Sequence, residues 1–123
     1  MSRKAEQAVL YKHSGCNCCQ AVIKALCDDE KLLAAGAGFA VGMGSMQATC
    51  GALIGAVMAA GEKTGGRGTL SLSKRMFADF KGMCGATVCA ELKGIATGKA
   101  LCDCDSCVRN AVTAFENVTG GVS

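Results

Sequence analysis

Apolar residues recur at helical spacing along most of this 123-residue chain, and no stretch shows the alternation that is typical of a strand. The pattern predicts helices over residues 4–13, 16–27 and 31–35, from Cys50 onward, from about 69 to 81, from about 87, and from about 104 to 118. Clusters of glycine separate these stretches. We therefore expect an all-α fold, a single domain over residues 1–123 that forms a bundle of five to six short helices with Gly-rich connections.

One apolar stretch is long enough to raise the question of a membrane span. Residues 32–61 contain no charged residue, and about 20 apolar residues suffice to cross a bilayer. The same stretch holds seven glycines, each of which costs roughly 1 kcal/mol inside a helix. Two buried segments joined by a Gly-rich turn fit this composition better, so we expect no membrane insertion.

The overall composition narrows the class of protein. Hydrophobic residues make up 50% of the chain but aromatic residues only 4%, so small aliphatic and sulfur-containing side chains must fill the core. The net charge of +3 arises from 13 basic and 10 acidic residues that are scattered along the chain. Because no basic run occurs, we expect no binding to nucleic acid.

Ten cysteines are the strongest chemical signal in the sequence. Residues 1–7 lead into no apolar signal core, so we expect a cytoplasmic location. In that reducing compartment, cysteines at this density indicate metal binding or redox chemistry rather than structural disulfides. The only histidine, His13, lies three residues before Cys16 and is either a further ligand or a solvated loop residue.

Four of the cysteines fall at predicted helix starts. Cys18 follows Asn17, Cys50 follows Thr49, Cys89 lies beside Thr87, and Cys104 lies beside the candidate caps Asp103 and Asp105. Helix N-termini present unpaired N–H groups and the positive end of the dipole, which stabilise thiolates and anionic clusters. We expect these four sulfurs to converge on one site. The glycines at 51 and 55 leave one face of the Cys50 helix nearly bare, so another helix or an inorganic cluster could approach it closely.

These segments also carry a family resemblance. Residues 17–22, residues 38–46, the run Thr49-Cys50-Gly51-Ala52-Leu53-Ile54-Gly55-Ala56, and Cys89 and Cys104 with Val108 and Ala111 downstream resemble the redox-active family C_GCAxxG_C_C. The resemblance covers about residues 8–118. It implies redox activity and matches the family's four cysteines to Cys18, Cys50, Cys89 and Cys104. The other six cysteines, Cys16, Cys19, Cys27, Cys84, Cys102 and Cys107, are additions in this chain.

The cysteines permit three kinds of chemistry. An iron–sulfur cluster needs about four thiolates, and Cys18, Cys50, Cys89 and Cys104 supply that number as cofactor ligands. The wider set of candidate metal ligands is Cys16, Cys18, Cys19, Cys50, Cys84, Cys89, Cys102, Cys104 and Cys107. Residues 102–107 contain a Cys-x-Cys and a Cys-x-x-Cys, spacings that suit zinc, iron–sulfur clusters, copper(I) or a reversible disulfide.

The first hypothesis is a small cytoplasmic iron–sulfur or related metal-cluster protein that transfers electrons to an unidentified redox partner protein. The alternatives are a metal-free thiol–disulfide redox protein and a store or carrier of copper(I) or zinc. A redox or metal-binding protein is favoured over a turnover enzyme, because the acidic residues form no evident catalytic pair. A homodimer is a further expectation, since a flat Gly/Ala helix face could pair with its twin.

Overall fold

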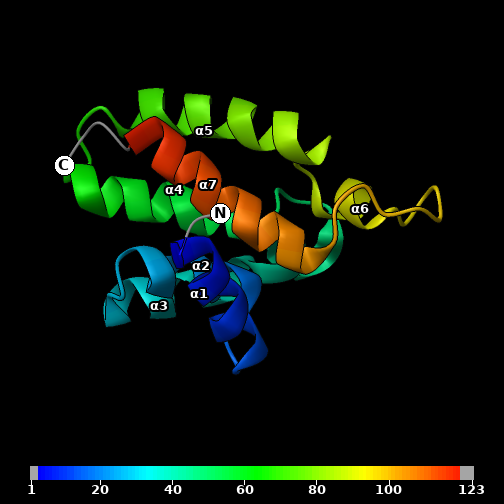
Figure 1. Ribbon diagram of the computed structural model, residues 1–123, viewed down its shortest axis with the longest axis horizontal. Coiled ribbons are helices and arrows are strands. Elements are labelled where there is room, and N and C mark those ends of the chain that lie inside the picture. The colour runs from blue at the N-terminus through cyan, green and yellow to red at the C-terminus, as the bar shows by residue number, and fades with distance from the viewer. Residues whose placement is uncertain (1–2, 120–123) are drawn as a thin grey trace.

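The computed structural model describes residues 3–119, which fold into seven α-helices and contain no β-strand (Figure 1). The helices are α1 (Arg3–His13), α2 (Cys18–Leu26), α3 (Glu30–Gly36), α4 (Gly51–Thr64), α5 (Thr69–Cys84), α6 (Cys89–Lys93) and α7 (Cys104–Thr119), with two irregular turns, η1 (Ala37–Phe39) and η2 (Gly42–Met46), between α3 and α4. The expected all-α fold is confirmed. The number of helices exceeds the expected five to six, because all seven stretches with helical spacing, including the one that holds the five-residue α6, form separate helices.

Helices α4 and α7 lie at the centre of the bundle (Figure 1). Helix α4 packs against α2, α5 and α7, and α7 also packs against α1. The buried side chains at these contacts are small or medium-sized: Ala52, Ala56, Ala59 and Ala60 on α4, and Val108, Ala111, Val112 and Phe115 on α7. This core follows from a composition that is rich in alanine and poor in aromatic residues.

The bare face of α4 is occupied by α2. A Cβ atom on Gly55 would lie 2.6 Å from the carbonyl oxygen of Cys19, so no larger residue fits between these two helices. The close approach that the glycine spacing predicts is therefore the approach of a helix in the same chain. Because α2 covers this face, the surface on which we based the expectation of a homodimer is not available to a second copy.

The connection between α3 and α4 has an unusual backbone. Val41, Gly42, Met43 and Gly44 all have positive φ values, between 54° and 73°. Valine is β-branched and strongly disfavours this left-handed region. The segment brings the chain back to the start of α4, close to the first residue of α6, because a Cβ on Gly42 would lie 2.8 Å from the Cβ of Cys89.

Among residues 3–119, no helix has both the length and the apolar character that a membrane span requires.

Candidate metal centre

A cavity of about 270 Å³ lies where the starts of four helices meet. Six cysteines contribute to its lining: Cys16, Cys18, Cys50, Cys89, Cys104 and Cys107. Four of them mark the helix starts, since Cys18, Cys89 and Cys104 are the first residues of α2, α6 and α7, and Cys50 directly precedes α4. The structure therefore brings the four cysteines at predicted helix starts to one cavity.

Two of these cysteines are held side by side by paired backbone. The N–H of Cys50 donates to the carbonyl oxygen of Thr87 at 2.7 Å, and the N–H of Cys89 donates to that of Ala48 at 3.0 Å. Between them, Thr49 and Val88 form an isolated antiparallel bridge. These bonds connect segments that are about 40 residues apart in the sequence and fix the starts of α4 and α6 relative to each other.

Because of this pairing, two of the predicted N-cap residues are wrong. Cys50 itself, and not Thr49, occupies the N-cap position of α4, and Val88, and not Thr87, occupies that of α6. The backbone of Thr49 is extended because it takes part in the bridge with Val88. Sequence reasoning favoured threonine for its hydroxyl, but long-range pairing determines both positions.

The other two helix starts have the side-chain caps that the sequence predicts. The Asn17 side chain accepts from the N–H of Gln20 at 2.9 Å, and Gln20 completes a capping box at the start of α2. At α7, the Asp103 carboxylate accepts from the N–H of Ser106 at 2.7 Å. Asn17 also donates to the carbonyl oxygen of Ala37 at 3.0 Å, which fixes the start of α2 against η1.

Gly51 allows the chain to pass close to Cys18. A Cβ atom on Gly51 would lie 2.6 Å from the carbonyl oxygen of Phe39 and 3.0 Å from the Sγ of Cys18. Any side chain at this position would push into the η1 turn and the first cysteine of α2. The glycine that follows Cys50 is therefore required by the geometry of the cavity wall.

Two lysines add positive charge to the cavity lining. The Lys93 ammonium donates a hydrogen bond to the Sγ of Cys104, and this bond raises the pKa of Lys93 above its usual value. The Lys12 ammonium lies 3.1 Å from the carboxylate of Asp105. The His13 ring also forms a hydrogen bond with Asp105, at 2.9 Å, and its side chain is 59% exposed, so it belongs to a contact at the surface rather than to the cavity.

The cysteines at the helix starts differ in the direction in which their pKa values shift. The neighbouring Cys107 thiol and, to a smaller extent, the backbone N–H groups of Ala52 and Leu53 together lower the pKa of Cys50 to about 7, against the opposing effect of burial. Burial instead raises the pKa of Cys18 and of Cys89. The expected stabilisation of a thiolate at a helix start therefore holds for Cys50, where two free N–H groups of α4 lie close to the sulfur.

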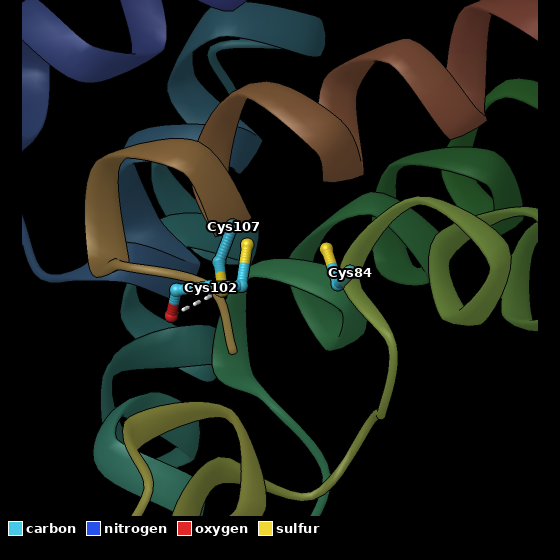
Figure 2. Close-up of side chains that lie close together, drawn as sticks. All are labelled: Cys84, Cys102 and Cys107. Carbon is cyan, nitrogen blue, oxygen red and sulfur yellow. Dashed lines mark hydrogen bonds between the residues drawn. The ribbon is translucent and has the colours of Figure 1, made fainter. Parts of the chain in front are cut away.

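A second group of cysteines lies beside the cavity. The sulfurs of Cys84, Cys102 and Cys107 all lie within 4.8 Å of one another, and all three residues are buried. Figure 2 shows that they come from the end of α5, the loop before α7 and the first turns of α7. This buried cluster could hold a metal ion.

Hydrogen bonds lower the pKa of one member of this cluster. The neighbouring Cys107 and, to a smaller extent, the side-chain amide of Asn110, 3.2 Å from the Cys84 sulfur, together lower the pKa of Cys84 to about 6, against the opposing effect of burial. The Cys107 thiol donates a hydrogen bond to the carbonyl oxygen of Cys102, 3.7 Å away, and the neighbouring sulfurs of Cys50 and Cys84 raise the pKa of Cys107 far above the usual range. Burial raises the pKa of Cys102 to about 11.

A comparison with protein-family models identifies the chain. The model described as "Putative redox-active protein (C_GCAxxG_C_C)" matches residues 16–118. The chain belongs to the C_GCAxxG_C_C family. The match contains all the cysteines that line the cavity, and it confirms the resemblance that the sequence suggested. No curated protein and no solved structure matched the chain in the corresponding searches.

Two cysteines of this C_GCAxxG_C_C protein belong neither to the cavity nor to the group of Cys84, Cys102 and Cys107. Cys19, one of the predicted metal ligands, is fully buried where α2 meets α4, and its sulfur is 3.1 Å from the position of a Cβ on Gly36. Burial raises its pKa to about 12. Cys27, at the end of α2, is half-buried and packs against the hydrophobic core. None of the ten cysteines, all of which lie within residues 3–119, is in a disulfide.

Sequence reasoning missed the basic residues of the cavity and the amide beside the second cluster. Lys93 lies four residues after Cys89 on α6, and this spacing, which places two side chains on one helix face, was a usable signal. The approach of Asn110 to Cys84 had no such signal, because the two residues come from different helices and lie 26 positions apart.

Proposed function

We propose that this member of the redox-active C_GCAxxG_C_C family is an iron–sulfur protein that transfers electrons, with Cys18, Cys50, Cys89 and Cys104 as ligands of the cluster. One observation carries the proposal: the cysteines at the starts of α2, α4, α6 and α7 line a single cavity. Iron–sulfur clusters are held by about four thiolates from separate parts of a chain.

The spacing of the sulfurs supports a cluster rather than a single ion. Two metal–sulfur bonds of roughly 2.3 Å at a tetrahedral angle hold their sulfurs about 4 Å apart. Within residues 3–119, the three cysteines whose sulfurs all lie within 4.8 Å of one another are Cys84, Cys102 and Cys107, so the four proposed ligands are spread more widely around the cavity. A cluster with several irons, each held by its own thiolate, suits this wider spacing.

The charges around the cavity also support an anionic group. Lys12 and Lys93 are part of the lining, and two backbone N–H groups of α4 lie close to the Cys50 sulfur. When bound, an iron–sulfur cluster gains or loses single electrons. Hydrogen bonds to the sulfurs and exclusion of water would set its reduction potential, and Lys93 and the buried Leu92 supply these two effects here.

A cytoplasmic protein that passes electrons to a redox partner protein fits these features. Ten free thiols would persist in a reducing compartment and would pair in an oxidising one.

A metal-free thiol–disulfide function is the second candidate, and the contact between Cys50 and Cys107 favours it. Cys50 has a lowered pKa of about 7 and lies within hydrogen-bonding distance of the Cys107 thiol, as an attacking and a resolving cysteine would. Alkylation and mass spectrometry over a series of redox potentials test this candidate. A reversible Cys50–Cys107 disulfide in metal-free protein would support it, and free thiols at all potentials would exclude it.

The proposed electron transfer can be tested on protein purified without oxygen. We expect visible absorbance, which bleaches on addition of dithionite and returns on controlled oxidation, together with a paramagnetic signal in one of the two states. Protein that stays colourless after anaerobic reconstitution with iron and sulfide would contradict the proposal.

A further inference from the structure

We propose that Cys84, Cys102 and Cys107 form a second metal site that binds one Cu(I) ion, separately from the proposed cluster. Cys84 is the last residue of α5, Cys102 lies in the loop before α7, and Cys107 lies in the first turns of α7 (Figure 2). This inference does not depend on what the larger cavity holds, because only Cys107 belongs to both groups.

The geometry suits one ion. All three sulfurs lie within 4.8 Å of one another, and thiolates on one metal ion lie about 4 Å apart when each bond is roughly 2.3 Å. A shift of less than about 1 Å would therefore complete the site. The three cysteines are 4%, 8% and 3% exposed, so an ion between them would be shielded from water.

The number and kind of ligands favour Cu(I). Within residues 3–119, no histidine, aspartate or glutamate joins this group, so its side chains offer three sulfurs and no imidazole or carboxylate. Structural zinc almost always takes four ligands, and a buried site has no water to provide the fourth. Cu(I) is a soft ion that thiolates select, and three of them are enough to coordinate it.

Asn110 supports this arrangement from outside the ligand set. Its side-chain N–H groups lie 3.2 Å from the Cys84 sulfur and 3.8 Å from the Cys102 sulfur. Donors of this kind orient metal-bound thiolates and stabilise their charge. Each thiol that coordinates the ion releases its proton to solvent, and the oxidation state of the copper does not change.

Zinc could use this site only with a fourth sulfur, and Cys50 is the one available. Cys50 contacts Cys107 by a hydrogen bond, although it is not a member of the compact trio. The Cys50→Ser variant therefore separates the two ions. It should leave the affinity for Cu(I) unchanged, whereas a four-coordinate ion would lose a ligand.

The test uses reduced, metal-free, full-length protein without oxygen, titrated with Cu(I) against the competing chelator bicinchoninate. We expect one tightly held ion and, by X-ray absorption, three sulfur neighbours. Asn110→Leu alters only an outer contact and should lower the affinity for Cu(I) by roughly 10- to 100-fold. Cys102→Ser removes a ligand and should lower this affinity by more. Thermal unfolding followed by circular dichroism shows whether each variant folds, and Cys84→Ser replaces Cys102→Ser if the latter does not.

Matched controls keep the two proposed sites distinct. Cys27→Ser, at the end of α2, and Cys89→Ser, in the cavity, should both bind Cu(I) as the wild type does. Iron and sulfide contents measured on the same variants report on the cluster alone, so either proposal can fail without the other. Unchanged Cu(I) affinity in Cys102→Ser, loss of affinity in Cys89→Ser, or four sulfur neighbours in the wild type would each overturn the Cu(I) site.

Discussion

At the scale of single residues, the cysteine site depends on positions that lack a side chain. Gly51 and Gly55 lie on one face of α4, and a Cβ at either position would come within 2.6 Å of a backbone oxygen. Neither oxygen can move away easily, because they belong to η1 and α2, which both pack against α4. Small residues here permit close packing of α2, η1 and α4, and so keep Cys18 close to the start of α4.

Replacement of Gly55 by alanine should therefore destabilise the fold. The clash with the carbonyl oxygen of Cys19 should cost about 1–3 kcal/mol, more than the roughly 1 kcal/mol that alanine gains inside a helix. Gly82→Ala in α5 is the matched control, because a Cβ there meets no atom within 4 Å. We expect Gly82→Ala to raise the free energy of unfolding, measured by chemical denaturation, and Gly55→Ala to lower it. A Gly55→Ala variant as stable as the wild type would refute the close contact.

A second residue-scale prediction concerns Cys50 in the metal-free, reduced protein. Its alkylation rate should rise as the pH increases through about 7, because the thiolate is the reactive form. Cys107→Ala removes the hydrogen bond that does most to lower this pKa, so the midpoint should move upward and the rate at pH 7 should fall by roughly tenfold or more. Iodoacetamide labelling followed by mass spectrometry measures both quantities. An unchanged midpoint in Cys107→Ala would contradict the assigned cause.

At the scale of elements, the beginnings of helices position the sulfurs. The caps at Asn17 and Asp103 could be predicted because a side chain bonds to an N–H only three residues away. The positions of Thr49 and Val88 could not, because a bridge between segments about 40 residues apart determines their backbone. The apolar periodicity likewise located the helices but not their number, since it cannot separate a five-residue helix from a turn.

The cap at Asn17 should contribute to both stability and the site. Asn17→Ala removes the bond to the Gln20 N–H and the link to the Ala37 carbonyl oxygen, at a cost of about 1 kcal/mol or more. Asp29→Ala at the start of α3 is the control, since it also removes a cap, at about 1 kcal/mol, but does not line the cavity. Denaturation curves should show both losses, and only Asn17→Ala should also lower the iron content after reconstitution. Equal iron contents in the two variants would argue against a role for this helix start.

At the scale of the whole molecule, six segments far apart in the chain supply the cavity and the buried trio. The convergence of four helix starts was predictable from the chemistry of caps and dipoles together with the family resemblance. The grouping of Cys84, Cys102 and Cys107 was not, because it depends on how α5 packs beside α7. The exclusion of Cys19 from the cavity also depends on packing, since its neighbour Cys18 lines the cavity while the Cys19 sulfur lies beside Gly36 at the end of α3.

The most direct test of the central claim is the amount of iron and acid-labile sulfide per protein after anaerobic reconstitution of the wild type, Cys89→Ser and Cys27→Ser. Cys89 lines the cavity and Cys27 does not. A comparison of the two variants therefore shows whether the loss of a proposed ligand, rather than the loss of any cysteine, lowers the iron and sulfide contents. We predict equal, stoichiometric iron and sulfide in the wild type and Cys27→Ser, and a marked loss of both in Cys89→Ser. A wild type that takes up neither, or a Cys89→Ser variant that retains as much as the wild type, would contradict the account.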